Sequence, residues 1–160
     1  MNRSMRRKER QMSQEAATEL MKRGEYGVLS SVDEEGQPYG VPVSYAFDGE
    51  KTIFFHCAKE GHKLDNLKTN PKVCFTVVGD TQVLDWKFTT AYESVIVFGI
   101  ASEVEDDEKY QGLRMLMLKY SPGFEDNFNK DIEKAMRPTQ VMRIQVKQLT
   151  GKELKVDDNE

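Results

Sequence analysis

Two turn signals near the start of the chain separate three strand-forming segments and restrict how these strands can pair. The segments are 26–32, 38–47 and 52–57. An Asp-Glu-Glu-Gly turn at 33–36 separates the first two, and Asp48-Gly49, a strong hairpin signal, separates the last two. Connections this short join antiparallel neighbours, so the chain is predicted to begin its sheet as a meander.

The later segments do not follow the strand-helix alternation of a parallel sheet. Strands are predicted at 72–79, at 93–104 and at 139–147 with its end at Thr150-Gly151, and a weaker one at 82–88. Within 93–104, alternation places Val95 and Val97 on one side of the strand and Ile96, Phe98 and Ile100 on the other. The 72–79 segment has too many apolar residues for simple alternation, which predicts burial on both faces. Helices are predicted at 13–24, with Ser13 as the N-cap, and at 62–70, 106–119 and 124–136. We therefore expect a mainly β (α+β) fold, a small barrel of six to seven antiparallel strands with peripheral helices, in a single domain over 1–160.

Residues 55–64 read as a strand that runs directly into a helix, with two basic side chains at the junction. Leu64 and Leu67 have helical spacing, so His62 and Lys63 fall in the first turn. Cations are unfavourable at a helix N-terminus, which already carries partial positive charge and unpaired N–H groups, unless a negative ligand faces them. A phosphate group would remove the conflict. The alternative is that Lys63 simply points into water.

Two residues in the neighbouring strands are candidates for contact with a planar ligand. Pro42 cannot donate to a sheet ladder, so its strand is predicted to be an edge. Its free peptide groups could bind a heterocycle, or the proline could only guard the edge against aggregation. His56 shares a strand face with Phe54. Its imidazole is either a hydrogen-bonding or acid/base group for a ligand or a structural histidine.

Composition and missing motifs argue against several classes of protein. A net charge of −4 disfavours a nucleic-acid-binding body. No apolar run reaches the roughly 18 residues of a membrane span, so we expect no membrane association and a cytoplasmic location. Two histidines and two cysteines without Cys-x-x-C spacing supply no compact ligand set, so no metal is expected. The glycine-rich nucleotide-binding motifs and the hydrolase nucleophile motif are absent.

Four segments carry a pattern that is specific when taken together. They are Gly40-Val41-Pro42-Val43-Ser44-Tyr45, the stretch 53–67 with His56-Cys57 and Gly61-His62-Lys63, Asn70-Pro71-x-Val73, and Tyr92-Glu93-Ser94-Val95 with Gly99. This order resembles the pyridoxamine-phosphate-oxidase-like FMN-binding split barrels, and within them the 5-nitroimidazole-resistance (Nim) proteins. The resemblance covers residues 5 to 152 and implies a homodimer with an FMN at each subunit interface.

The resemblance also implies roles for individual positions. The 40–45 strand would line the isoalloxazine ring through Val41, Pro42, Val43, Ser44 and Tyr45, chiefly by backbone groups of Val43 and Ser44. His56 and Cys57 would flank the ring and ribityl chain, His62 and Lys63 would hold the phosphate, and Ser94 would approach from a later strand. His56 matches the Nim branch and is the expected catalytic residue. His62 stands where the phosphate-oxidase branch has arginine, and that branch's C-terminal substrate-binding elements are not recognisable, which puts pyridoxamine phosphate oxidation in doubt.

The resemblance implies an FMN-dependent oxidoreductase, with FAD as the alternative flavin. NAD(P)H or another donor would reduce the flavin, which would pass electrons to a small acceptor such as a nitroaromatic. Two alternatives stay open. One is a non-catalytic flavin-binding or flavin-sensing protein, and the other is a haem-binding split barrel with His56 or His62 as axial ligand.

Overall fold

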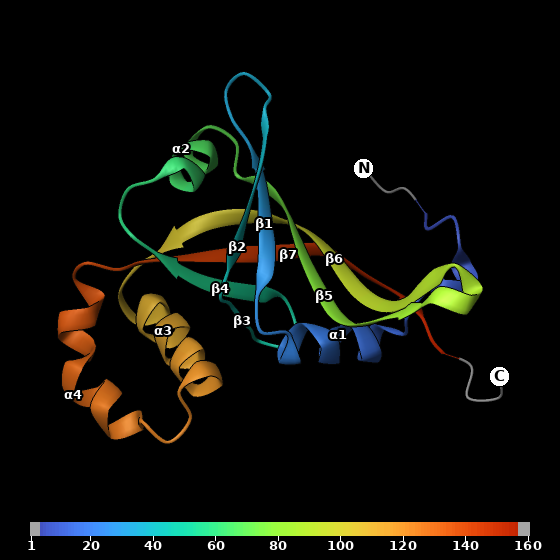
Figure 1. The fold of residues 1–160 in the computed structure, drawn as a ribbon. Coiled ribbons are helices and arrows are strands. Elements are labelled where there is room, and N and C mark those ends of the chain that lie inside the picture. Colours follow the sequence, from blue (N-terminus) through green and yellow to red (C-terminus); the bar gives the residue numbers. More distant parts are fainter. Residues whose placement is uncertain (1–3, 157–160) are drawn as a thin grey trace.

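The computed structural model describes residues 4–156 and contains one seven-stranded antiparallel sheet with four α-helices (Figure 1). The strands are β1 (Gly27–Val32), β2 (Pro38–Val43), β3 (Ala46–Phe47), β4 (Thr52–Cys57), β5 (Lys72–Leu84), β6 (Thr89–Val104) and β7 (Gln140–Leu154). The helices are α1 (Gln14–Arg23), α2 (His62–Thr69), α3 (Asp106–Tyr120) and α4 (Glu125–Met136). The predicted mainly β split barrel is confirmed.

The sheet curves into a barrel that stays open between its two edge strands, β2 and β3. The strand order is β2-β1-β5-β6-β7-β4-β3, so β2 and β3 form opposite edges although only Ser44 and Tyr45 separate them. The prediction of one continuous strand over 38–47 was therefore wrong. Both backbone groups of Tyr45 lie 2.9 Å from the Tyr120 hydroxyl instead of joining a ladder, and the Tyr45 ring is fully buried. Because Tyr45 is not paired in the sheet, the chain can pass from one edge strand, β2, to the other, β3.

The barrel interior holds the main hydrophobic core, and two helices close it. Leu20 and Met21 of α1 are fully buried in this core, and Leu64 and Leu67 of α2 join it. The Ser13 side chain caps α1 by accepting a hydrogen bond from the backbone N–H of Ala16 at 3.1 Å, as predicted from the sequence.

The last strand runs further than predicted, to Leu154, so Gly151 lies inside β7 rather than at its end. A β-carbon at Gly151 would stand 2.8 Å from side-chain atoms of Met12 and Ala17. Glycine is therefore required there by the close approach of the α1 segment, not by a turn.

A smaller apolar cluster lies on the opposite side of the sheet, beneath α3. Phe54, Val104 and Val141 form it, and Leu113 and Met115 of α3 pack against it. Gly112 permits this approach, because a β-carbon there would stand 2.9 Å from the Phe54 ring. Helices thus cover the outer surface beside β4 and β7, as Figure 1 shows.

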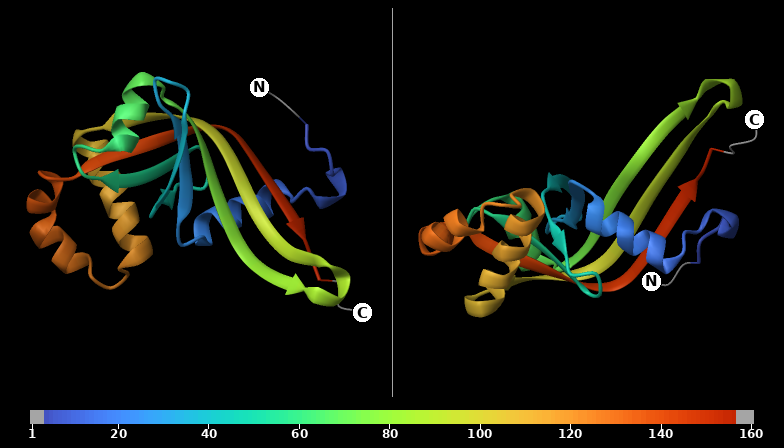
Figure 2. Two further views of the ribbon diagram at one scale, coloured as in Figure 1. Left: turned by 45° about the horizontal axis from the view of Figure 1, so that its top comes forward. Right: turned by 90° about the horizontal axis from the view of Figure 1, so that it is seen from below.

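Beyond a register shift between Val78 and Thr81, β5 and β6 extend from the barrel as a long curved hairpin, which we call the arm (Figure 2). The strand predicted over 82–88 is only half right. Gln82–Leu84 continue β5, whereas Asp85–Lys87 form a 3-10 turn followed by Phe88 in the left-handed conformation at φ 49°. Trp86 and Phe88 at the tip are exposed.

The expectation that 72–79 is buried on both faces was also wrong. Along β5, Val73, Phe75 and Val77 are buried, whereas Val78 is 57% exposed. On β6, Val95 and Val97 are buried while Ile96 and Phe98 remain 40% and 48% exposed. One face of these strands therefore builds the barrel interior, and the other is an apolar outer surface.

Candidate functional site

The first turn of α2 forms one end of the candidate site. The helix begins at His62, as predicted, with Gly61 as its N-cap at φ 144°. No side chain of the described residues caps this helix, and a β-carbon at Gly61 would meet nothing within 4 Å. His62 is exposed and Lys63 is half-buried. The structure therefore presents an accessible helix N-terminus flanked by two basic side chains, which is suited to an anion.

Edge strand β2 reaches this helix end through an aromatic contact. The rings of Tyr39 and His62 lie with their centroids 4.1 Å apart. Helix α2 is anchored from below, because the buried Asn66 side chain donates a hydrogen bond to Ser31 of β1 at 3.0 Å. The contact with Tyr39 therefore places the start of β2 directly beside the first turn of α2.

Cys57 and His56 point to opposite sides of β4. Cys57 packs against the main core. Burial raises the pKa of its thiol and the Glu103 carboxylate adds to this, while the positive charge of Lys63 opposes both. Cys57 therefore lies within electrostatic reach of Lys63. His56 is exposed on the other side of the strand and opposite Val141 of β7, so the two neighbours do not present their side chains to one common surface.

The five predicted residues of the 41–45 segment divide between the core and the surface. Val41 and Val43 pack against the main core, whereas Pro42 and Ser44 are exposed. In the described sheet β2 pairs only with β1, so the predicted edge strand is confirmed. Tyr45 differs from the rest. Its side chain is fully buried and its hydroxyl donates a hydrogen bond to the Met21 carbonyl at 2.6 Å. Its backbone N–H donates to the Tyr120 hydroxyl, so neither its side chain nor its N–H is free for a ligand.

Ser94 lies on the apolar outer surface of the sheet, on the same side as Pro42. Strand pairing defines this surface, because Pro42 pairs with Val28, Val28 with Thr76, and Thr76 with Ile96. Ser94 is two residues from Ile96 on the same strand and pairs with Val78. The structure thus brings Ser94 and Pro42 to one side of the sheet, whereas Lys63 and Cys57 gather at the α2 end.

A cavity of about 640 Å³ opens at the other end of β2, and no sequence pattern indicates it. It is lined by Lys22, Arg23, Glu25, Tyr26, Ser44, Lys119 and Tyr120. The Tyr120 hydroxyl lies 2.6 Å from the Glu25 carbonyl as well as beside Tyr45, so it ties α3 to this segment. A basic residue and a tyrosine before Ser121-Pro122-Gly123 look like an ordinary helix end, which is why sequence reasoning missed them.

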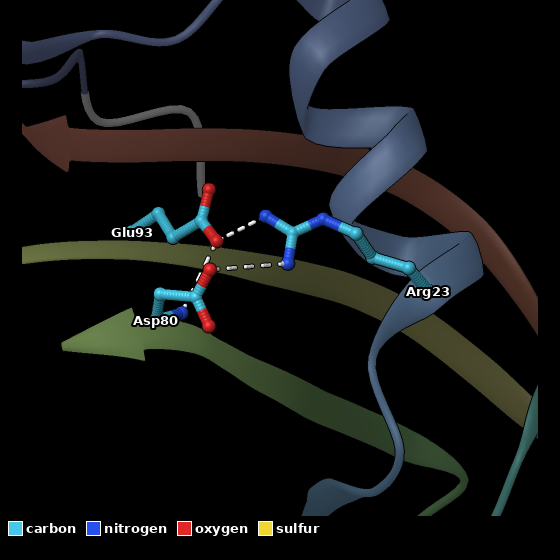
Figure 3. A network of polar contacts seen from close by, with 3 residues as sticks. All are labelled: Arg23, Asp80 and Glu93. Atoms are coloured by element: carbon cyan, nitrogen blue, oxygen red, sulfur yellow. Dashed lines mark hydrogen bonds and ion pairs between the residues drawn. The ribbon is translucent and has the colours of Figure 1, made fainter.

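Arg23 also lines the cavity, and its guanidinium is held in an ion-pair network with Glu93 and Asp80 (Figure 3). Its guanidinium donates a hydrogen bond to Glu93 and lies 3.9 Å from Asp80, whose backbone N–H also donates to Glu93 at 3.1 Å. Burial opposes ionisation of Glu93, but the hydrogen bonds from Arg23 and Asp80 outweigh it and lower the pKa of this carboxyl. The network fixes the last residue of α1 against the base of the arm.

A model of one protein family matches most of this chain, over residues 13–153, and that family is described as pyridoxamine 5'-phosphate oxidase. The chain belongs to the pyridoxamine 5'-phosphate oxidase family. A curated relative, an uncharacterized protein from Rhizobium meliloti (strain 1021), is 30% identical over 95 residues, which cover 59% of this chain. The matched part spans only 57% of that relative's length.

Solved structures similar to this pyridoxamine 5'-phosphate oxidase family member share its fold. One is described as a 5-nitroimidazole antibiotic resistance protein from Bacteroides thetaiotaomicron, with a TM-score of 0.69 and 25% identity over 92% of this chain and 84% of that one. Another is an FAD and haem binding protein from Mycobacterium smegmatis, with a TM-score of 0.80 and 18% identity over 93% and 76% of the two chains. The fold is therefore that of the flavin-binding split barrels.

Two further features are absent from the part of the chain that the structure describes. Between residues 4 and 156, no group of three or more His, Cys, Asp or Glu side chains is arranged to hold a metal ion. Within the same residues, no helix has the length and apolar character needed to cross a membrane.

Proposed function

We propose that this protein is an FMN-dependent oxidoreductase that reduces a small acceptor such as a nitroaromatic compound. One observation carries the proposal: edge strand β2 connects an accessible, basic helix N-terminus beside Tyr39 to a cavity beside Ser44. Five residues of extended strand span about 17 Å. This separation suits a ligand with a phosphate at one end and a planar ring at the other, as in a flavin mononucleotide.

The phosphate would lie at the first turn of α2. Lys63 and the uncapped backbone N–H groups would supply hydrogen bonds to it, and the helix dipole would add favourable potential. His62, exposed in the same first turn, would contribute a further hydrogen-bond donor to the phosphate. His62, Lys63 and the N-terminus of α2 fit a phosphate, because its negative charge would balance the positive potential that they create together.

The ring would lie along the exposed edge of β2. Backbone groups of Val43 and Ser44 would hydrogen-bond its polar edge, since no other described strand pairs with β2 on that side. Pro42 and Ser94 would approach from the outer surface of the sheet, and Val41 would support the strand from the core. Tyr45 would support this segment rather than contact the ring, because its side chain is buried and its backbone N–H donates to the Tyr120 hydroxyl.

The chemistry divides between the cofactor and the protein. A bound flavin would supply two-electron redox chemistry between NAD(P)H and the acceptor, for example the reduction of a nitro group with two protons to a nitroso group and water. The exposed His56 imidazole would donate a hydrogen bond or a proton to the acceptor. Cys57, with its thiol kept protonated, would line the ribityl chain without acting as a nucleophile.

The proposed site also requires a second copy of the chain. The outer surface of β5 and β6 exposes Val78, Ile96 and Phe98 around Ser94, and a contiguous apolar patch of this kind is typical of an interaction surface. A two-fold homodimer would cover both copies of the patch and enclose the ring from its open side.

The visible spectrum of the purified protein tests the proposal. A two-banded flavin spectrum that bleaches with NAD(P)H and recovers on adding a nitroaromatic acceptor is the expected result. If the protein shows a flavin spectrum but reduces no acceptor when NAD(P)H or another reductant is added, it is a flavin-binding or flavin-sensing protein instead. A Soret band, or failure of the protein to bind added FMN, would overturn the assignment.

A further inference from the structure

The cavity beside Ser44 contains a cation that the proposed flavin site does not use. Lys119, in the last turn of α3, lines this cavity, and its buried ammonium has no hydrogen-bond partner among the described residues. The ammonium lies 3.8 Å from the centroid of the Tyr45 ring and 5.3 Å from that of Tyr120. Cation–π attraction is therefore its main favourable contact within the described fold.

An unpaired buried ammonium lowers stability. Removal from water disfavours the charged form, and burial accordingly lowers the pKa of Lys119 to about 8. A methionine or leucine would fill the same space over Tyr45 without that cost. A residue that lowers the stability of the fold is expected where its side chain binds a ligand.

The other cations of the cavity are already neutralised. Arg23 is paired with Glu93 and Asp80, and Lys22 is 3.1 Å from Glu19 on the surface of α1. Lys119 alone among the cavity-lining cations lacks an acidic partner within the described chain. Glu25, which also lines the cavity, disfavours a ligand with two or more negative charges.

We infer that this cavity binds a small organic monocarboxylate, which the Lys119 ammonium holds by a charge-assisted hydrogen bond. The long flexible side chain can turn the ammonium from the Tyr45 ring to the cavity that it already lines. Tyr26, which is 58% exposed, and Tyr120 offer aromatic surface to the remainder of the ligand.

The location beside Ser44 would make the cavity an acceptor subsite next to the ring, and this part of the inference rests on the proposed function. Binding of the carboxylate does not rest on it. An aromatic acid is the expected form of acceptor, since one end of the ligand would meet an ammonium and the rest would lie between tyrosine rings.

Calorimetric titration of the purified full-length protein with benzoate, and separately with its neutral analogue benzamide, tests the inference. Benzoate should bind to the parent and bind roughly tenfold or more weakly to Lys119→Met, since a charge-assisted hydrogen bond is lost. Benzamide should not distinguish the two proteins. Lys119→Arg should retain most of the affinity, and Lys22→Met, which removes an ion-paired cation from the same cavity, should change it less than about twofold.

Raising the pH from 7 to 9 adds an independent readout. Lys22, Arg23 and Glu25 also face the cavity, and burial raises the pKa values of the Tyr45 and Tyr120 hydroxyls, away from this window. Benzoate binding should therefore weaken as Lys119 loses its proton, and the weakening should be absent in Lys119→Arg.

The outcomes separate this inference from the proposed function. Equal benzoate affinity in the parent and a folded Lys119→Met, or no binding at all, would overturn the carboxylate site even if the protein is a flavin reductase. Lysine-dependent benzoate binding in a protein that holds no flavin would support the site and contradict the proposed function. If benzoate binds through Lys119 without competing against 4-nitrobenzoate reduction, the acceptor assignment is wrong.

Discussion

The rings of Tyr39 and His62 lie with their centroids 4.1 Å apart and their planes inclined by 32°. This contact joins edge strand β2 to the first turn of α2, two elements separated in the chain by β3 and β4. Without it, the basic helix end and the free strand edge would be separate features. With it, they form two parts of one elongated surface that a phosphate-bearing ligand can follow.

Lys63→Ala should weaken FMN binding by roughly 1.5–3 kcal/mol, because a charge-assisted contact to the phosphate is lost. Flavin retained after dialysis is the measurement. Lys68→Ala is the matched control, since Lys68 lies in the last turn of the same helix and is 3.5 Å from Asp65. Equal flavin content in the Lys63 variant and the parent would exclude the phosphate site.

His56→Ala should keep its yellow colour but reoxidise more slowly with a nitroaromatic acceptor, by roughly 10²-fold if the imidazole donates a proton or hydrogen bond during transfer. The reason is position: His56 is exposed on β4, several residues before the helix that carries Lys63. Stopped-flow absorbance measures the rate. Unchanged acceptor reduction, or a colourless variant, would argue against this role.

Phe98→Asp should convert the proposed dimer to a monomer and reduce flavin retention with it. Phe98 is 48% exposed on the apolar outer surface of β6 in the single chain. In the proposed dimer this position would be buried, and an aspartate carboxylate there would have no partner. Light scattering after size exclusion reports the mass. Phe124→Asp, at a 61% exposed site between α3 and α4, should leave the mass unchanged. A flavin-saturated monomeric parent at micromolar concentration would rule out the dimer.

Between about pH 8 and 10.5 the folded state should gain stability from Lys119 as the pH rises. Below pH 8 both the folded and the unfolded chain hold the Lys119 proton, so this group adds no pH dependence. Above it the folded chain releases the proton while the unfolded chain keeps it until about 10.5, so the free energy of unfolding increases.

Urea denaturation of the parent and Lys119→Met across this range isolates the effect, because the variant retains every other titrating group, including the Cys57 thiol whose pKa is also raised. Lys119→Met should be the more stable protein below pH 8, and its advantage should shrink above it. If the free energies of unfolding of the parent and Lys119→Met change in parallel with pH, burial of the Lys119 ammonium does not lower stability.

Gly151→Ala should destabilise the protein by about 1–3 kcal/mol, because the added methyl group would overpack the contact with Met12 and Ala17. Thermal or denaturant unfolding measures the change. Gly40→Ala is the control, since a β-carbon there would lie 3.5 Å from Val28, an ordinary contact distance. A similar effect at both positions would mean that the α1 segment can move away from β7.

Local signals determined the parts of the fold that depend on neighbouring residues. The Asp48-Gly49 turn, the Ser13 cap and the start of α2 at His62 were predicted correctly, because hairpin geometry, capping and helical spacing act within a few residues. The basic first turn of α2 follows from the sequence for the same reason. Alternation also separated buried Val95 and Val97 from exposed Ile96 and Phe98.

Contacts between distant segments decided the rest. The break at Tyr45 depends on the hydroxyl of Tyr120, 75 residues away, and the glycine inside β7 depends on the approach of Met12. Apolar residues on the second face of 72–79 predicted burial, but no described element covers that face, and Val78 stays exposed. The burial of Lys119 has the same origin, because only packing against Tyr45 distinguishes it from an ordinary lysine at a helix end. Residue patterns report local preferences, whereas which surfaces meet, and which charges lose their water, follows from the path of the whole chain.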